Sequence, residues 1–98
     1  MTKKLKLSDL AEFDPTKYLD DEAVAEYITL AIEDGDSGLL AAALGDVARA
    51  RGMTQVAQAA GLTREALYKA LRPDAHPRFD TIHRVCKALG VRLTATAS

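Results

Sequence analysis

The sequence is poor in the residues that build disulfide frameworks and metal centres. Its 98 residues include one cysteine, Cys86, and two histidines, His76 and His83. A single cysteine excludes an internal disulfide bond and any zinc site built from several cysteines. Two histidines could form a structural metal site only together with several carboxylates. We therefore expect no metal and no other cofactor, and we assign Cys86 to the core.

Long apolar runs are also missing, although hydrophobic residues make up 48% of the chain. No run approaches the ~18 to 20 residues that a membrane-spanning helix needs. The opening residues, Met-Thr-Lys-Lys-Leu, lack the apolar stretch and the cleavage site of a signal peptide. A chain this apolar does not remain disordered, and its length suits one small domain. We expect a cytoplasmic protein with a single domain over residues 1–98 and no membrane partner.

Arrangements of residues that would support catalysis are absent as well. The sequence contains no nucleophile–base pair, no cluster of metal ligands and no glycine loop of the kind that cradles phosphate. Glu22 and Glu26 stand one turn apart on a predicted helix, but such a pair on an acidic helix is usually plain surface. We therefore predict a binding protein with no catalytic residues rather than an enzyme.

Charge is divided unequally between the two halves of the chain. Residues 1–46 carry four lysines and eleven acids, whereas residues 47–98 carry nine lysines and arginines and three acids. The halves therefore have net charges of −7 and +6, although the whole chain has a net charge of −1. This division favours two partners of opposite charge. The alternative is that both charged faces are only solvated surface.

Turn-forming and capping residues divide the chain into five predicted helices. The first runs from Asp20 or Asp21 to about Asp34, and the second from Asp36 or Ser37 to about Ala50. Three shorter helices follow at about residues 55–60, 64–71 and 81–89. Their expected N-caps are Thr54, Thr63 and Asp80. Gly45 interrupts the second helix at a cost of ~1 kcal/mol, which a close helix crossing would explain. Phe79, before the last helix, is expected to enter the core.

Alternating polar and apolar residues at both ends of the chain predict short strands. Residues 4–7 alternate in this way, and residues 91–96 are also rich in β-branched side chains. The two strands would pair within the chain or across a dimer, because neither is stable alone. The expected fold is thus all-α, with five helices and short terminal β-strands. Residues 1–19 would form an N-terminal arm and residues 91–98 a C-terminal strand or tail.

Residues 53–72 have the pattern of a helix-turn-helix: a short helix, a glycine turn at Gly61, a threonine cap and a second short helix. Leu67 and Leu71, four residues apart, would anchor the second helix to the core. An ordinary helical hairpin with a glycine turn is the alternative. With those anchors buried, polar side chains of the second helix must point outward.

The outward-facing residues have the chemistry of a DNA-reading surface. Arg64 can donate two hydrogen bonds to guanine, and Glu65 can accept one from cytosine. Tyr68 and Lys69 would reach phosphates or thymine methyl groups, and the loop after the helix would line the DNA backbone. The predicted contacts to double-stranded DNA are Gln55, Thr63, Arg64, Glu65, Tyr68, Lys69, Arg72, His76 and Arg78. For each of them, simple solvent exposure is the alternative.

The stretch ALGDVARARGMTQVAQAAGLTREALYKALRPDAHPRFDTIHRVCKALGVRL resembles the helix-turn-helix of the phage Cro and cI repressors, the XRE class. It is more closely similar to small addiction-module antidote proteins, and this resemblance extends upstream to FDPTKYLDDEAVAEYITL. The resemblance implies the antitoxin of a type II toxin–antitoxin pair, which neutralises a toxin and represses their shared operon. The implied toxin is a small basic protein of the RelE/ParE superfamily, often an mRNA-cleaving ribonuclease.

The acidic first helix would be the surface complementary to such a toxin. The predicted toxin contacts are Tyr18, Leu19, Asp21, Glu22, Glu26 and Tyr27, with the alternative that Leu19 and Tyr27 only pack against the second helix. Because one short recognition helix reads few base pairs, we expect a two-fold homodimer on a palindrome. Its interface would use the last helix and residues 91–96. The alternatives to an antitoxin are a stand-alone phage-type repressor and a protein-interaction module.

Overall fold

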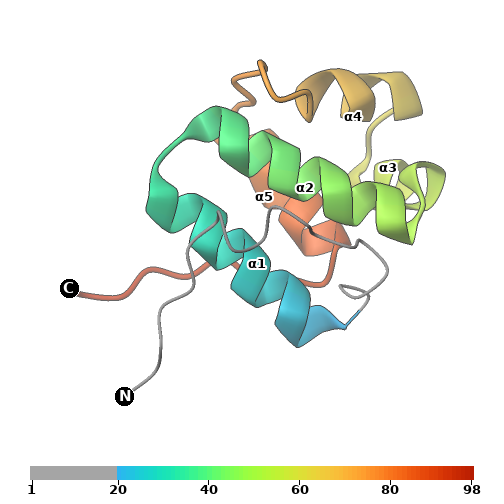
Figure 1. Ribbon diagram of the computed structural model, residues 1–98. Helices are drawn as coiled ribbons and strands as arrows, with labels where there is room; N and C mark the ends of the chain where they lie inside the picture. The colour runs from blue at the N-terminus through green and yellow to red at the C-terminus, as the bar shows by residue number, and fades with distance from the viewer. Residues whose placement is uncertain (1–19) are drawn as a thin grey trace.

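The computed structural model describes residues 20–98, and this part of the chain forms five helices (Figure 1). In chain order they are α1 (Asp21–Asp34), α2 (Ser37–Arg51), α3 (Met53–Ala60), α4 (Arg64–Ala70) and α5 (Phe79–Ala88). Residues 20–98 contain no strand, so the described architecture is all-α. The helical part of the predicted fold is confirmed. The predicted N-terminal arm, including the strand at residues 4–7, lies outside the described residues.

α1 and α2 form a helical hairpin whose ends are set by side-chain caps. The carboxylate of Asp20 accepts a hydrogen bond from the backbone N–H of Glu22 at 2.7 Å, and Asp36 accepts one from Gly38 at 2.8 Å. Each carboxylate satisfies N–H groups that have no partner within the helix. Gly35 joins the two helices with a φ of 84°, a conformation that glycine adopts without strain.

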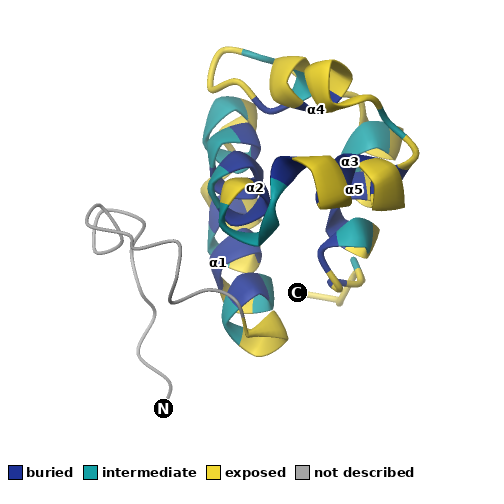
Figure 2. Ribbon diagram, turned by 90° about the vertical axis from the view of Figure 1, so that its right-hand side faces the viewer, coloured by how far each residue is buried: buried dark blue, intermediate teal, exposed yellow. Residues whose placement is uncertain are grey.

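The core is shared by all five helices and by the residue that follows α5. α1 packs on α2, and α3 contacts α2, α4 and α5. The largest fully buried side chains are Ile28, Leu44, Leu67 and Leu89, each from a different part of the chain. Figure 2 shows the buried faces turned inward, whereas much of α4 is exposed. The short α4 is therefore fixed to the domain by a few anchors and leaves most of its surface open.

The predicted C-terminal strand is wrong. Residues 91–98 are extended but form no ladder with any described residue. Val91 is buried, and Leu93 is partly buried against the core. The alternation of apolar and polar residues thus reflects an extended segment whose apolar side chains pack against the helices. Residues 20–98 offer this segment no second strand to pair with, and a single strand is not stable alone.

Two predicted helix starts are also wrong. α3 begins at Met53 and α5 at Phe79, so Thr54 and Asp80 lie inside the first turns and do not cap them. Gly52 ends α2 and begins α3 without a side-chain cap. Met53 is buried, and packing its side chain in the core places the start of α3 before Thr54, the predicted cap. Asp80 instead places a negative charge in the first turn, where it suits the helix dipole.

Phe79 does not enter the core as the sequence predicted. Its side chain is 70% exposed and stacks on the ring of His83, with 6.2 Å between ring centroids. α5 instead buries Val85 and Leu89, on another face of the helix. This orientation leaves Phe79 and His83 together on the surface.

Glycines in α2 let the end of α4 and the loop after it approach closely. A Cβ atom on Gly45 would lie 3.3 Å from the carbonyl oxygen of Leu71, so the residue that ends α4 lies close to α2 at this glycine. A Cβ atom on Gly38 would lie only 2.4 Å from the carbonyl oxygen of Pro73. The backbone that leaves α4 is therefore laid directly against α2.

Candidate nucleic-acid interface

The connection between α3 and α4 is short and held by its own hydrogen bonds. Gly61 has a φ of 73°, and the N–H of Leu62 donates to the carbonyl of Ala57 at 2.9 Å. The hydroxyl oxygen of Thr63 then accepts from the N–H of Ala66 at 3.0 Å and caps α4. These bonds fix the direction of α4 relative to α3. The cap at Thr63 was predicted correctly, and its hydroxyl oxygen serves the helix.

α4 presents one buried face and one exposed face. Leu67 and Leu71 are 0% and 3% exposed, so both predicted anchors are confirmed. The four polar positions that the sequence placed outward are exposed: Arg64, Glu65, Tyr68 and Lys69. The geometry therefore leaves a helix face that carries donors, an acceptor and an aromatic ring open to a partner.

Arg64 and Tyr68 interact across one turn of this exposed face. The guanidinium carbon of Arg64 lies 5.3 Å from the centre of the Tyr68 ring, and Nη2 lies 3.4 Å from the Tyr68 hydroxyl oxygen. Residues four apart on a helix are neighbours, and a guanidinium is attracted to an aromatic face. The contact restricts Arg64 while leaving its other N–H groups free to donate.

The loop after α4 carries two arginines in weak ion pairs. Arg72 lies 3.9 Å from Asp74, and Arg78 lies 3.4 Å from Asp80. The arginine side chains are 61% and 87% exposed, so solvent screens both pairs. Both guanidinium groups remain available to an anionic partner.

Two other predicted DNA contacts, His76 and Gln55, lie against other parts of the protein. Nδ1 of His76 lies 2.9 Å from the hydroxyl oxygen of Ser37, which ties the loop to the start of α2. The side-chain amide of Gln55 lies over Gly52, so close that its Oε1 would clash with a Cβ atom at that glycine. Both residues are exposed, yet neither lies on the outer face of α4.

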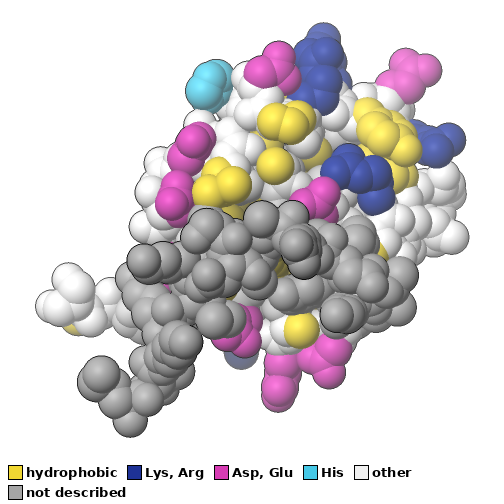
Figure 3. All heavy atoms as spheres, viewed as in Figure 1, with side chains coloured by type: hydrophobic (Ala, Val, Ile, Leu, Met, Phe, Trp, Pro, Cys, Tyr) yellow, Lys and Arg dark blue, Asp and Glu magenta, His cyan; other side chains and the backbone are white. Residues whose placement is uncertain are grey.

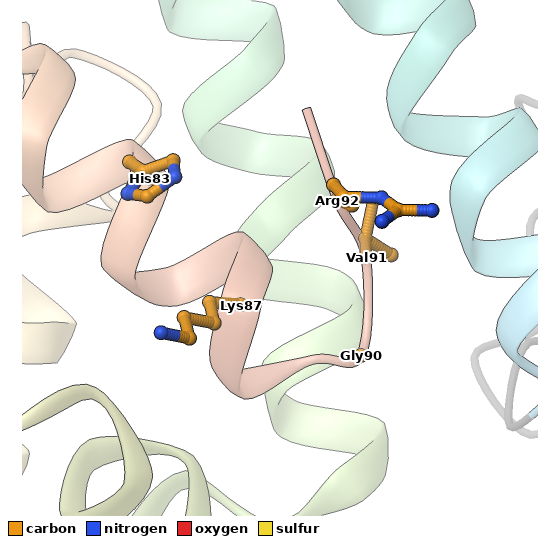
Figure 4. Close-up of a pocket in the computed structure, with 5 residues that line it drawn as sticks. All are labelled: His83, Lys87, Gly90, Val91 and Arg92. Atoms are coloured by element: carbon orange, nitrogen blue, oxygen red, sulfur yellow. The ribbon is translucent and has the colours of Figure 1, made fainter. Parts of the chain in front are cut away.

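Sequence reasoning missed the basic residues of α5. Lys87 lines an open groove of about 550 Å³ together with His83, Gly90, Val91 and Arg92 (Figure 4). Arg92 points away from His83 and Lys87 in this view, so the charges do not converge on one point. Arg84 and Lys87 border a second open groove beside α3. The sequence could have indicated a basic surface here, because Arg84 and Lys87 are three residues apart on one predicted helix.

Metal ligands and the single thiol are the remaining chemical features of residues 20–98. Within that range no group of three or more His, Cys, Asp or Glu residues could hold a metal ion. Burial raises the pKa of the Cys86 thiol to about 11, which keeps it protonated and unreactive near neutral pH. No described helix is both long and apolar enough to cross a membrane.

Acidic residues dominate the first part of the described chain, and basic residues dominate the second part. Residues 20–48 contain eight acids and no lysine or arginine, whereas the basic residues follow from Arg49 onward. On the face seen in Figure 3, Lys and Arg side chains lie mainly at the upper right, where acidic side chains also lie, and other Asp and Glu side chains lie at the left and lower edges. Acidic side chains therefore dominate the left and lower parts of this face, and acidic and basic side chains mix at the upper right.

The predicted toxin contacts are only partly on the surface. Tyr27 is 7% exposed and its hydroxyl donates to Asp46 at 3.2 Å, so it packs against α2, as the alternative interpretation held. The carboxylate of Asp21 pairs with Arg51 at 2.7 Å. Glu22 and Glu26 are exposed. Tyr18 and Leu19 lie outside the described residues.

Residues 20–98 thus form a small all-helical domain with an acidic first helix and with exposed basic side chains on and after α4. Residues 9–97 match the model of a family described as "Probable addiction module antidote protein", and the chain belongs to this family. It is 39% identical over 98 residues to an uncharacterized protein of Haemophilus influenzae, covering 100% of this chain and 97% of that protein. No solved structure matches the chain. The antidote of an addiction module acts on a toxin, so the family implies a toxin partner.

Proposed function

We propose that this protein is a cytoplasmic type II antitoxin that binds operator DNA through α4, neutralises a RelE/ParE-like toxin and represses its own operon. Family membership supports the antitoxin role and favours it over a stand-alone repressor without a toxin. Binding alone accounts for this role, and no catalytic step is part of the proposal.

The observation that carries the DNA-binding part is the presentation of α4. Its anchors Leu67 and Leu71 are buried, the capped turn fixes its direction, and its outer face exposes Arg64 and Lys69. Helix-turn-helix proteins place the second helix of such a pair in the major groove. The exposed Arg72 and Arg78 in the following loop would then contact phosphates.

A homodimer forms part of the proposal because a helix of seven residues reads few base pairs. The exposed pair Phe79 and His83 supplies apolar surface on α5 for such an interface. A two-fold dimer would read a palindrome whose half-sites lie about one helical turn, ~34 Å, apart. Light scattering with DNA present checks this arrangement, and a monomer at micromolar concentration would contradict it.

The DNA-binding part is tested with a labelled duplex from the region upstream of this gene and a scrambled duplex of equal composition. Fluorescence anisotropy should show tighter binding to the upstream duplex, and log K for both should fall linearly with log salt. Equal affinity for the two duplexes would reject operator recognition. No binding to either would leave a protein-interaction module as the better description of residues 53–72.

The toxin part is tested with the protein encoded by the reading frame beside this gene. A small basic toxin should arrest growth when expressed alone, and co-expression with this protein should restore growth. Purification should then yield a stable complex of the two chains. If the neighbouring protein neither binds nor arrests growth, the stand-alone repressor becomes the better interpretation.

A further inference from the structure

We infer that the groove between α1 and the C-terminal segment is where the toxin docks, seating an aliphatic side chain from a basic segment of that protein. The inference rests on the proposed antitoxin function and adds the site of contact. The groove has a volume of about 370 Å³. Its apolar lining residues come from two elements: Ala25, Ile28 and Ile32 on α1, and Val91 and Leu93 from the C-terminal segment. The polar residues of the lining are Thr29, Glu33, Arg92, Thr94 and Thr96.

The exposed side chain of Ile32 is the feature of this groove that favours a protein partner. Its side chain is 44% exposed. The other large hydrophobic side chains exposed in residues 20–98 are Tyr68 on α4 and Phe79 on α5, so Ile32 stands apart from them. The hydroxyl of Thr29, in the groove lining, donates to the carbonyl of Ala25 at 2.7 Å and is satisfied within the helix. The floor is therefore suited to an apolar side chain, the usual anchor of a protein interface.

The charge around the groove selects the kind of partner. Glu22, Glu26 and Glu33 follow one another at helical spacing along the flank of α1 beside Thr29 and Ile32, and Glu33 lines the groove itself. Arg92 is the basic residue of the lining. Since residues 20–48 hold eight acids and no lysine or arginine, this side of the protein repels DNA and attracts a basic protein.

A second copy of this chain fits the groove poorly. In a two-fold interface the same patch contacts itself, so the α1 carboxylates of both copies would face one another. Like charges across an interface are unfavourable. A basic segment with an aliphatic residue instead meets the apolar lining with its side chain and the glutamates with its charges.

The groove is separate from the proposed DNA-reading helix. Its lining comes from α1 between Ala25 and Glu33 and from the C-terminal segment, with no residue of α4 or of the loop after it. In both ribbon views the C-terminal segment lies below α4 (Figures 1 and 2). Occupation of the groove therefore leaves the outer face of α4 open. A change at Ile32 should alter toxin binding without altering operator binding.

The test uses the full chain and the protein encoded by the neighbouring reading frame as the probe. Ile32→Ser should raise the Kd for that protein by about tenfold or more, as expected on losing a central apolar anchor. Operator affinity and thermal unfolding should stay close to the wild type. As a matched pair, a photo-crosslinking amino acid at position 32 should capture the toxin, and one at Ala59, exposed on α3, should not.

The outcomes separate this inference from the function on which it rests. If the wild-type chain does not bind the neighbouring protein, the antitoxin proposal fails and the inference fails with it. If the complex forms but Ile32→Ser binds normally and position 32 does not crosslink, the groove is not the docking site and the antitoxin proposal stands. If Ile32→Ser dissociates a homodimer instead, the occupant is a second copy and the inference is overturned.

Discussion

Arg64 and Lys69 share the outer face of α4, but their side chains differ in what they can recognise. A guanidinium can donate two parallel hydrogen bonds to guanine, whereas an ammonium acts as a point charge on phosphate. We expect Arg64→Ala to cost ~1 to 3 kcal/mol on the operator and to relax specificity locally. Lys69→Ala should weaken binding to all duplexes equally and flatten the salt slope by about one unit. Equal losses of specific and non-specific binding by Arg64→Ala would contradict its assignment to bases.

Gly38 is required by packing rather than by its backbone angles. Alanine in a helix is usually ~1 kcal/mol more favourable than glycine. Here the added Cβ atom would meet the carbonyl oxygen of Pro73 at 2.4 Å, and a backbone atom cannot turn aside. We expect Gly38→Ala to lower the free energy of unfolding by ~1 to 3 kcal/mol in urea titrations. A stabilised variant would show that the loop does not lie against α2.

Cys86 makes stability depend on pH at the alkaline end. Its pKa rises from 9.0 to about 11 because burial disfavours the thiolate. Since the folded pKa is the higher one, its contribution is complete below pH 9 and is lost as the pH rises toward 11. The native protein should resist Ellman's reagent at pH 8, and guanidinium-unfolded protein should react at once. Rapid labelling of the native state would contradict the burial.

At the scale of elements, Arg51 links three helices at one point. It pairs with Asp21 at the start of α1, and its Nη1 donates to the carbonyl of Leu89 at the end of α5. Its side chain is 18% exposed, so these bonds are partly shielded, whereas Asp21 is 68% exposed. We expect Arg51→Met to lower the free energy of unfolding by ~1 to 3 kcal/mol.

Asp21→Asn is the matched control for Arg51→Met. It removes only the exposed ion pair, so we expect a loss below ~1 kcal/mol in the same urea titration. Equal losses in the two variants would show that the contact with Leu89 contributes little.

The elements that could be predicted from the sequence are those with strong local signals. Thr63 caps α4 as expected, because a capping side chain acts within three residues of its own position. Asp20 and Asp36, each one of two residues predicted at the start of a helix, are the caps of α1 and α2. Tertiary packing decided the remainder. The burial of Met53 moved the start of α3, and residues 91–98 pair with no strand within residues 20–98.

The candidate site divides in the same way. The inward and outward faces of α4 followed from the spacing of Leu67 and Leu71, which is a local pattern. The contact of His76 with Ser37 joins residues 39 positions apart, and no local sequence pattern predicts such a contact. The groove beside Ile32 likewise depends on how the C-terminal segment lies against α1.

For the whole molecule, the separated charges should control how fast the toxin is captured. We expect the double variant Glu22→Lys, Glu26→Lys to slow association at low salt and to leave operator binding nearly unchanged, because rim charges act mainly on the on-rate. Asp21 is left intact because it pairs with Arg51. Stopped-flow mixing with the neighbouring protein measures the rate. Unaltered capture together with damaged DNA binding would contradict the proposed division of labour.

The junction at Arg51 also brings the two ends of the helical domain together. A Cβ atom on Gly90, just after α5, would lie 3.1 Å from a carboxylate oxygen of Asp21, at the start of α1. The path of the chain through the five helices is thus nearly a closed ring. Domains with neighbouring ends tolerate circular permutation. The order of the helices along the chain could therefore be rotated by a short peptide joining residue 90 to residue 20, which would keep the five helices and the exposed face of α4 but would remove the buried Val91.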